Sequence, residues 1–307
     1  MKSFLQIPIA AFVLLVSCQT LLSAPAKKYG FSLPDHLQEV SMRYKSVDDL
    51  ILLPVVINDS IKVNLILDTG CRNLVLFGKR FQKLFKLEPD KKVQFSGLGS
   101  GRSVNGALSL SNKVAIDAVV GELLPVIVIP EQNLFHSFIN VHGVIGYDVF
   151  TKFEIEINPK EKQITFRPAA TATLNPDYIQ VPIRIADSRP LIDCRVVFDK
   201  NRTHVCDLMI DTGSTLGLLL KTTDMDSYKF KFRPRETVLG RGLNGDIEGY
   251  QTNTEVLQLS ALEIKNLPTG IIYSPWHNYA SIGMNILKNY TLVLNYCKGY
   301  AGFKKIV

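Results

Sequence analysis

Short apolar runs, each four to eight residues long, follow one another from residue 50 to the end of the chain. Gly, Pro, Asn and Asp separate them, which is the pattern of β-strands joined by turns. The clearest runs are LLPVVIND, IKVNLIL, KVAID, LPVIVIP, FEIEIN and QITFRP. Helical signals are confined to FGKRFQKLFKL and DVFTKF, which predict short helices. The chain is therefore predicted to be mostly β.

Three pairs of segments show that the chain repeats itself. LILDTGCRNLVLF returns as LMIDTGSTLGLLL, and GLGSGRSVNG returns as GRGLNGDIEG, both 143 residues further on. VIGYDVFTKFEIEINPKEKQITF returns as SIGMNILKNYTLVLNYCKGYAGF at a distance of 137 residues. An internal repeat that keeps its register predicts two copies of one folding unit. We expect two all-β lobes, over residues 49–170 and 171–307, each of the size of one domain.

The residues ahead of the first lobe are less informative. Residues 27–48 fit a linker, an N-terminal arm that supplies a first strand, or a short inhibitory segment. Composition does not decide among these three.

An Asp-Thr-Gly tripeptide interrupts an apolar strand in each copy, as Asp68-Thr69-Gly70 and Asp211-Thr212-Gly213. A single copy would read as a turn, because Asp and Gly both favour turns. Two copies in the same order, each followed by an Ile-Gly segment, resemble the aspartic peptidases of the pepsin and retropepsin type. The resemblance implies the acid protease fold, an all-β fold with two homologous β-barrel-like lobes and an active-site cleft between them. Both copies lie in one chain, as in pepsin.

The chemistry of that family explains why two carboxylates are needed. Two carboxylates held close together cannot both ionise, so the pair shares one proton. The ionised carboxylate can then take a proton from water, while the other donates to the peptide carbonyl. Asp68 and Asp211 are the predicted catalytic residues. Gly70 and Gly213 are expected to let the backbone approach the carboxylates, where a Cβ would obstruct it.

The resemblance also implies roles for the supporting residues. Thr69 and Thr212 would cross-link the two loops through their hydroxyl groups, and Ser214 is expected to hydrogen-bond the outer oxygen of Asp211. Cys71 departs from the family's usual Ser, Thr or Ala, and a thiol is a weak donor. The Gly-rich segment 97–106 is either a flap of the first lobe, as the resemblance implies, or a plain loop.

The N-terminal segment, residues 1–26, predicts export. A basic start precedes an apolar stretch from Ile7 to Val16, which is too short to span a bilayer but typical of a signal peptide. Ala24-Pro25-Ala26 fits an ordinary cleavage site, whereas Leu15-Val16-Ser17-Cys18 resembles a bacterial lipobox. In the second case Cys18 would be a lipid anchor. We expect a membrane-anchored lipoprotein on the periplasmic or outer surface, or otherwise a secreted protein.

Charge and cysteine usage bear on which partners and cofactors the chain is expected to bind. The net charge is +7, but Lys and Arg are spread along the whole chain, so no nucleic-acid partner is expected. Cys194 and Cys206 flank a predicted turn and could face each other across a hairpin. The sequence does not decide whether they form a disulfide. No Cys or His pair has the spacing of metal ligands, and neither a metal nor another cofactor is expected. The sequence favours an aspartic endopeptidase acting on polypeptides; the alternative is a two-lobed peptide-binding surface lipoprotein without activity.

Overall fold

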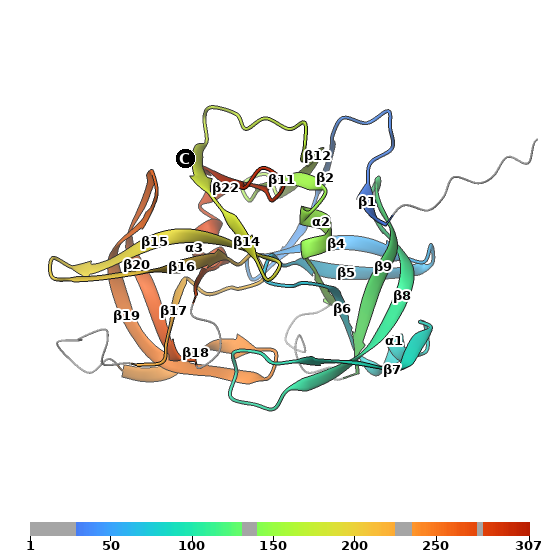
Figure 1. The fold of residues 1–307 in the computed structure, drawn as a ribbon, viewed down its shortest axis with the longest axis horizontal. Coiled ribbons are helices and arrows are strands. Elements are labelled where there is room, and N and C mark those ends of the chain that lie inside the picture. The colour runs from blue at the N-terminus through green and yellow to red at the C-terminus, as the bar shows by residue number, and fades with distance from the viewer. Residues whose placement is uncertain (1–28, 131–139, 225–234, 275–278) are drawn as a thin grey trace, which may run out of the picture.

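The computed structural model describes residues 29–130, 140–224, 235–274 and 279–307. Cys18 and the whole N-terminal segment lie outside these residues. The fold is all-β, as predicted, and consists of two lobes (Figure 1). Its helices within the described residues are short and include both predicted ones: α1 (Lys79–Gln82), α2 (Tyr147–Phe150) and α3 (Met284–Leu287).

The first lobe is one nine-stranded sheet, in which the order is β1-β9-β6-β10-β5-β4-β8-β7 and β3 pairs with β4. β-Branched and aliphatic residues fill these strands, as a pleated and half-buried surface favours. The strands are β1 (Gly30–Ser32), β3 (Lys45–Val47), β4 (Leu50–Ile57), β5 (Ile61–Leu67), β6 (Leu74–Phe77), β7 (Leu87–Phe95), β8 (Val104–Ile116), β9 (Val119–Ile129) and β10 (Gly143–Ile145).

The second lobe is an eight-stranded sheet with the order β14-β15-β16-β21-β17-β20-β19-β18. Its pairing repeats that of the first lobe, since β10 runs parallel to β5 and antiparallel to β6, and β21 runs parallel to β16 and antiparallel to β17. The strands are β14 (Arg184–Ala186), β15 (Arg189–Asp199), β16 (Arg202–Ile210), β17 (Leu218–Thr222), β18 (Arg235–Gly242), β19 (Gly245–Leu259), β20 (Leu262–Tyr273) and β21 (Ala280–Ile282).

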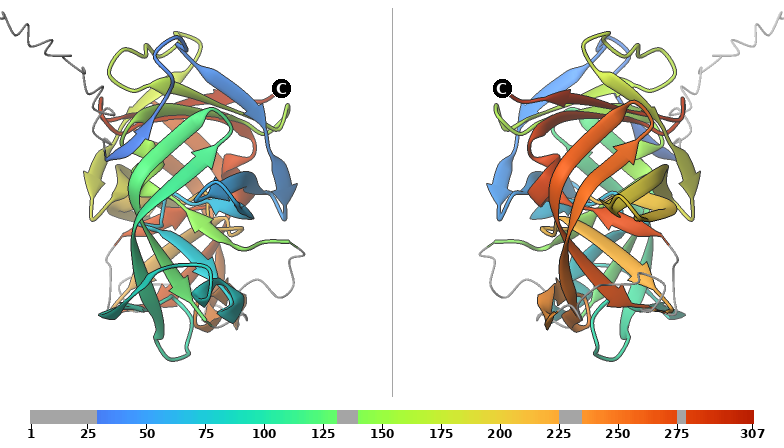
Figure 2. Two further views of the ribbon diagram at one scale, coloured as in Figure 1. Left: turned by 90° about the vertical axis from the view of Figure 1, so that its right-hand side faces the viewer. Right: turned by 90° about the vertical axis from the view of Figure 1, so that its left-hand side faces the viewer.

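A six-stranded sheet joins the two lobes in the order β13-β23-β22-β11-β12-β2. Its two halves are equivalent, because the hairpins β11–β12 and β22–β23 come from the two copies of the third repeated segment. The lobes meet where β11 pairs with β22. The two side views of Figure 2 look alike because the lobes share one topology, and a long hairpin of each lobe faces the viewer. The strands are β2 (Val40–Arg43), β11 (Phe153–Asn158), β12 (Gln163–Pro168), β13 (Ile179–Pro182), β22 (Tyr290–Asn295) and β23 (Tyr300–Lys305).

The segment ahead of the first lobe is built into the sheets. β1 pairs with β9, β2 pairs with β12 and β3 pairs with β4. Of the three alternatives left open for residues 27–48, the structure therefore shows an arm that supplies strands. In the second lobe, β13 and β14 occupy the places of β2 and β3.

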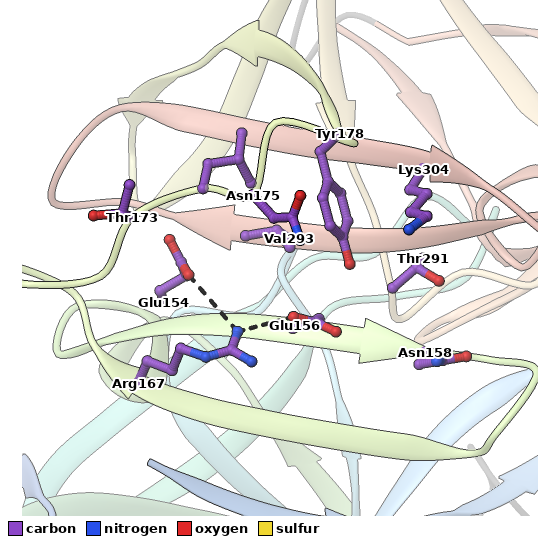
Figure 3. A pocket seen from close by; sticks show the side chains of 11 residues that line it. Glu154, Glu156, Asn158, Arg167, Thr173, Asn175, Tyr178, Thr291, Val293 and Lys304 are labelled. Carbon is purple, nitrogen blue, oxygen red and sulfur yellow. Dashed lines mark hydrogen bonds and ion pairs between the residues drawn. The ribbon is translucent and has the colours of Figure 1, made fainter. Parts of the chain in front are cut away.

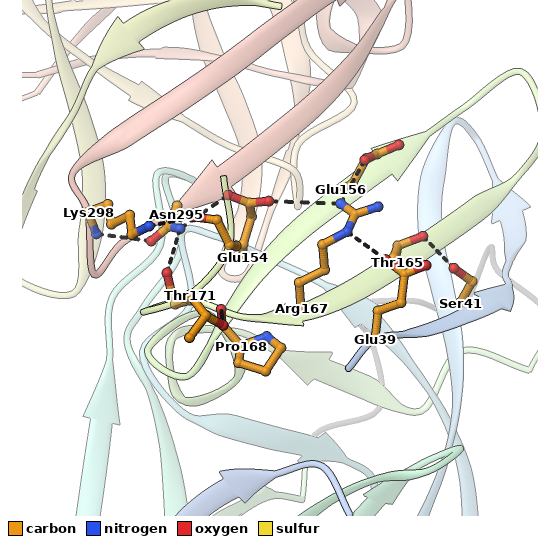
Figure 4. Close-up of polar contacts among 12 residues, drawn as sticks. Glu39, Ser41, Glu154, Glu156, Thr165, Arg167, Pro168, Thr171, Asn295 and Lys298 are labelled. Carbon is orange, nitrogen blue, oxygen red and sulfur yellow. Dashed lines mark hydrogen bonds and ion pairs between the residues drawn. The ribbon is translucent and has the colours of Figure 1, made fainter. Parts of the chain in front are cut away.

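A buried polar network ties the two halves of the six-stranded sheet together (Figure 4). Glu154 of β11, which is 2% exposed, accepts hydrogen bonds from the Asn295 side-chain amide (3.2 Å) and from the Tyr300 hydroxyl. Its other oxygen lies 3.8 Å from the Arg167 guanidinium. A buried carboxylate needs such partners to offset its lost hydration. The network thus favours one alignment of β11 against β22 and β23.

The β15–β16 hairpin places Cys194 directly opposite Cys206. Their Sγ atoms lie 3.5 Å apart, and both thiols are free. The predicted facing of the two cysteines is correct, and the structure shows them reduced.

Within the described residues, the structure contains no helix with the length and apolar composition needed to cross a membrane.

Candidate active site

Each Asp-Thr-Gly loop follows the end of a central strand, β5 in the first lobe and β16 in the second. The backbone N–H of Asp68 donates to the carbonyl of Ile145 (2.8 Å), and that of Asp211 donates to Ile282 (2.9 Å). Both acceptors belong to the Ile-Gly segments that the repeat singled out. These short strands therefore hold the two Asp residues at equivalent places of the two lobes.

The structure brings Asp68 and Asp211 together. A Cβ added to Gly70 would stand 3.1 Å from Asp68 Oδ1 and 3.4 Å from Asp211 Oδ1, so one point touches both carboxylates. A Cβ added to Gly213 would overlap the Asp68 carboxylate. The glycine N–H groups donate inward, from Gly70 to Asp68 Oδ1 (2.7 Å) and from Gly213 to Asp211 Oδ1 (3.1 Å). The close approach thus requires glycine at Gly213, whereas a Cβ at Gly70 would fit tightly against the two carboxylates.

Thr69 and Thr212 cross-link the two loops. The backbone N–H of each donates to the other's hydroxyl oxygen, at 3.1 and 3.0 Å. Each hydroxyl then donates across the interface, from Thr69 to the Ile210 carbonyl (2.6 Å) and from Thr212 to the Leu67 carbonyl (2.8 Å). Both side chains are fully buried. The four bonds fix the position of one loop relative to the other.

The surroundings of the two carboxylates disfavour ionisation. Burial, and then the charge of Asp211, raise the pKa of Asp68 to about 7, although the Gly70 N–H and Arg189 oppose the shift. Burial also raises the pKa of Asp211, against the Gly213 N–H, Lys221 and Arg189. Carboxylates this close titrate as a pair, which holds one proton over a range of pH. Asp68 and Asp211 are called the Asp pair below.

Ser214 and Cys71, the residues that follow the two Asp-Thr-Gly tripeptides, form hydrogen bonds that were not predicted. The Ser214 hydroxyl accepts a hydrogen bond from the Leu216 N–H (3.2 Å), and within the described residues it does not make the expected hydrogen bond to Asp211. The loop turns the hydroxyl back onto its own backbone, as an ST-turn does. The Cys71 thiol donates to the Asn73 carbonyl (3.0 Å). Burial, and then Asp68, raise the pKa of Cys71, so the thiol stays protonated.

A group of cations near the Asp pair was missed by sequence reasoning. Arg189 lies at the β14–β15 turn, where it pairs with Asp187, and Asp187 also reaches Arg72 beside the first loop (3.8 Å). Lys221 of β17 holds its ammonium 4.4 Å from the centre of the Tyr279 ring. In the sequence, Lys221 merely ends an apolar strand and Arg189 sits in a polar turn. Only the pairing of distant strands brings them to the site.

The two Gly-rich segments form hairpin tips that touch each other. We call residues 96–103, between β7 and β8, and residues 243–244, between β18 and β19, the two hairpin tips. Asn244 accepts a hydrogen bond from the Gly99 N–H (2.8 Å), and its amide donates to the Gly101 carbonyl (2.9 Å). The Gly101 N–H donates to the Asn244 carbonyl (2.7 Å). Both lobes supply a tip, whereas the sequence was interpreted as giving either a flap or a plain loop in the first lobe alone.

An apolar cluster connects the hairpin tips with the second Asp loop. Leu98 of the first tip packs in one cluster with Leu216 of the Asp211 loop. Leu219 of β17 and Leu239 of β18 belong to the same cluster. The first tip is thus held beside the Asp211 loop by apolar contacts, and the hydrogen bonds of Asn244 hold the two tips to each other.

A separate polar cavity of about 540 Å³ lies on the six-stranded sheet (Figure 3). Glu154, Glu156 and Arg167 line it, and their ion pairs occupy its floor. Its lining includes neither residue of the Asp pair. In the part of the chain that the structure describes, no cluster of His, Cys, Asp or Glu could hold a metal ion.

Comparison with known protein families gives a match in the first lobe. A family model described as aspartyl protease matches residues 53–149. The matched segment contains the Asp68 loop, the first hairpin tip and the first Ile-Gly segment, and it ends before the second copy begins. No curated protein matches the chain. The first lobe is therefore similar to aspartyl proteases.

Proposed function

We propose that the chain is an aspartic endopeptidase with two Asp-Thr-Gly lobes in a single chain, of the pepsin and retropepsin type. The observation that carries the proposal is the contact of both carboxylates with one point above Gly70. The match of an aspartyl protease family to the first lobe supports it. The topology of the second lobe repeats that of the first, which supports an equal role for Asp211.

Hydrolysis would proceed by shared acid–base chemistry. A water between Asp68 and Asp211 loses a proton to the ionised carboxylate and attacks the peptide carbonyl carbon. The protonated carboxyl group donates its proton to the carbonyl oxygen as that carbon becomes tetrahedral. The nitrogen then takes a proton from the pair and leaves as an amine when the C–N bond breaks, while one hydroxyl of the tetrahedral carbon returns its proton to the pair, which again holds a single proton. Thr69 and Thr212 hold the carboxylates in register throughout.

The substrate would be an extended polypeptide between the Asp pair and the hairpin tips. An extended chain can pair its backbone with nearby strands, while side chains contact apolar residues such as those of the Leu98 and Leu216 cluster. Entry would then require the tips to separate, because Asn244 joins them.

We also propose that the protein is exported and anchored through Cys18, as the lipobox-like Leu15–Cys18 suggests. Cys18→Ala should move the protein from the membrane fraction to the soluble fraction of its host. Continued recovery in the membrane fraction would contradict the anchor.

The proposed activity is tested with the chain from Lys27 onward and a mixed peptide library, across roughly pH 3 to 8, the range open to a shared pair. Asp68→Asn and Asp211→Asn should each abolish cleavage. Asp117→Asn makes the same change in the exposed β8–β9 turn and should leave it intact. Cleavage that survives in either Asp pair variant would contradict the proposal, as would a folded wild type that cleaves nothing.

A further inference from the structure

Lys221 is a buried cation without a matching anion. It is 8% exposed, and within the described residues its ammonium makes no hydrogen bond and no ion pair. The Lys221 ammonium is not among the fully enclosed side-chain atoms of the described residues that lack a hydrogen-bond partner, so it still reaches the surface. Lysine is rarely buried unless it is paired. The Lys221 side chain is buried but its ammonium reaches solvent, so the ammonium can bind an anion of a ligand.

The face of β17 that carries Lys221 is turned toward the proposed substrate. Side chains two apart on a strand share a face, so Lys221 and Leu219 point to the same side. Leu219 packs with Leu98 of the first hairpin tip and with Leu216 of the Asp211 loop. The ammonium also lies close enough to Asp211 to lower the pKa of that carboxylate.

Nearby groups hold the cation in place without neutralising it. The Tyr279 ring supports the ammonium at 4.4 Å, and the Arg189 guanidinium lies 6.0 Å from the same ring. Arg189 already pairs with Asp187 at the β14–β15 turn. An aromatic face attracts a cation but leaves its N–H groups free to bind an anion.

An aromatic residue holds the equivalent position of the first lobe. Val75 of β6 lies opposite Val144, and Leu219 of β17 lies opposite Ser281, at matching places beside the Ile-Gly segments. Two residues further along each strand, Phe77 stands where Lys221 stands. A cation that only served the shared core of the fold would be expected in both lobes. Lys221 therefore belongs to a function of one side of the site.

We propose that Lys221, supported by Tyr279 and Arg189, forms a subsite for the carboxylate side chain of an Asp or Glu residue in the substrate, close to the bond that is cut. This substrate class rests on the proposed peptidase function. The carboxylate would accept hydrogen bonds from the ammonium, which gives a charge-assisted contact at a site partly closed to water.

The test compares matched peptides that carry Glu or Gln at each position on either side of the cut bond. At about pH 6 the glutamate is ionised and Lys221 is charged, since burial lowers its pKa only to about 8. The wild type should favour Glu over Gln at one position by about tenfold in kcat/KM, as a hydrogen bond to a charged group allows. Because the two peptides meet the same Asp pair, any effect of Lys221 on the catalytic pKa values cancels in the ratio.

Lys221→Met should bring the ratio close to one, and Lys221→Arg should retain part of it. Lys265→Met removes an exposed lysine of β20 in the same lobe and should leave the ratio unchanged. A wild-type ratio near one at every position would overturn the inference, as would a ratio that survives Lys221→Met. A variant that shifts the pH profile but keeps the ratio would show that Lys221 acts on Asp211 alone.

Failure of the proposed function is distinguishable from failure of the subsite. If Asp68→Asn abolishes cleavage while the Glu/Gln ratio is near one, the peptidase stands and the subsite falls. If no peptide is cleaved, binding of the library peptides to Asp68→Asn decides the matter by calorimetry, since this variant retains Asp211 and Lys221. Tighter binding of Glu peptides that is lost in Lys221→Met would support the subsite, and equal affinity would overturn it.

Discussion

Asp68 and Asp211 are half-buried carboxyl groups that lie together where the two lobes meet. The pKa of each is raised, with burial as the first cause in both. The folded state therefore holds a proton that the unfolded chain releases. The stabilisation from this proton is complete below the ordinary carboxyl pKa of about 4 and is lost as the pH rises through about 7. Unliganded protein should thus lose stability between these limits.

Asp68→Asn should remove most of that loss. Asp211 would then ionise without a like charge beside it, so the variant should melt above the wild type at about pH 8 and near it at about pH 4.5. A chain of this size gains about 2–4 °C for each kcal/mol. Melting followed by circular dichroism at both pH values checks this. Asp117→Asn should follow the wild type, and parallel curves for Asp68→Asn would contradict the assigned cause.

At the scale of single residues, the sequence identified the candidate residues that the repeated tripeptide contains. It did not identify those that lie outside the tripeptide. Asp68, Thr69 and their partners were found because the same tripeptide occurs twice. Lys221 could not be found, because a cation at the end of an apolar strand is normally a solvated strand end. The hydrogen bond between the Leu216 N–H and the Ser214 hydroxyl was not predicted, because it depends on the turn geometry of its own loop.

At the scale of elements, the contact between the hairpin tips differs most from expectation. A Gly-rich tip in one lobe predicts a mobile flap, but the sequence does not show that two such tips are within reach of each other. Asn244 makes two side-chain hydrogen bonds to backbone groups of the other tip. Each such bond contributes about 1 kcal/mol. The closed arrangement is therefore a modestly stable state that substrate can open.

Asn244→Ala should loosen the tips while leaving the lobes folded. We expect faster amide hydrogen exchange at Gly99 and Gly101 and a fall in kcat/KM of about tenfold, which corresponds to the loss of about 1.4 kcal/mol. Exchange measured by NMR and cleavage of one reference peptide test both effects. Asn201→Ala alters the turn of another hairpin in the same lobe and serves as the control. Unchanged exchange at the two glycines would contradict the role of Asn244.

The β15–β16 hairpin is prepared for oxidation. A hydrogen bond with Cys194 is the main reason that the pKa of Cys206 is lowered to about 6. The Cys206 thiolate is therefore available near neutral pH. The two Sγ atoms must approach from 3.5 Å to a bond length of about 2 Å. Oxidation should stabilise the fold by about 2–3 kcal/mol, as expected for a short closed loop.

Urea unfolding of the oxidised and reduced protein measures this difference, and mass spectrometry shows the loss of two hydrogen atoms. Cys194→Ser should be insensitive to the oxidant. Equal midpoints for the oxidised and reduced wild type would contradict the predicted gain.

At the scale of the whole molecule, the two lobes are held by the six-stranded sheet and by the cross-linked Asp loops. The repeat in the sequence predicted the lobes and their shared topology. It did not predict that β1, β2 and β3 belong to the sheets, since short strands ahead of the repeat take their structure from partners far along the chain. Long-range pairing of this kind leaves no local pattern.

Thr212→Val should weaken the junction of the lobes. Valine keeps the shape of threonine but leaves the Thr69 N–H and the Leu67 carbonyl unpaired in a fully buried place. Each unsatisfied buried group costs about 1–3 kcal/mol, so the free energy of unfolding should fall by about 2–5 kcal/mol. Urea denaturation gives the value. Thr212→Ser retains the hydroxyl and should lose clearly less; an equal loss would assign the effect to packing instead.

The difference between Phe77 and Lys221 has a consequence for the direction in which a peptide is read. A symmetric pair of lobes presents the same surface to a chain running either way. Because a cation stands in the second lobe at the position that Phe77 holds in the first, the two orientations of an acidic peptide would no longer be equivalent. Only one of them brings the carboxylate to Lys221. In the proposed peptidase, duplication within a single chain, unlike assembly from identical chains, would allow the site to distinguish the N-terminal from the C-terminal side of the bond that is cut.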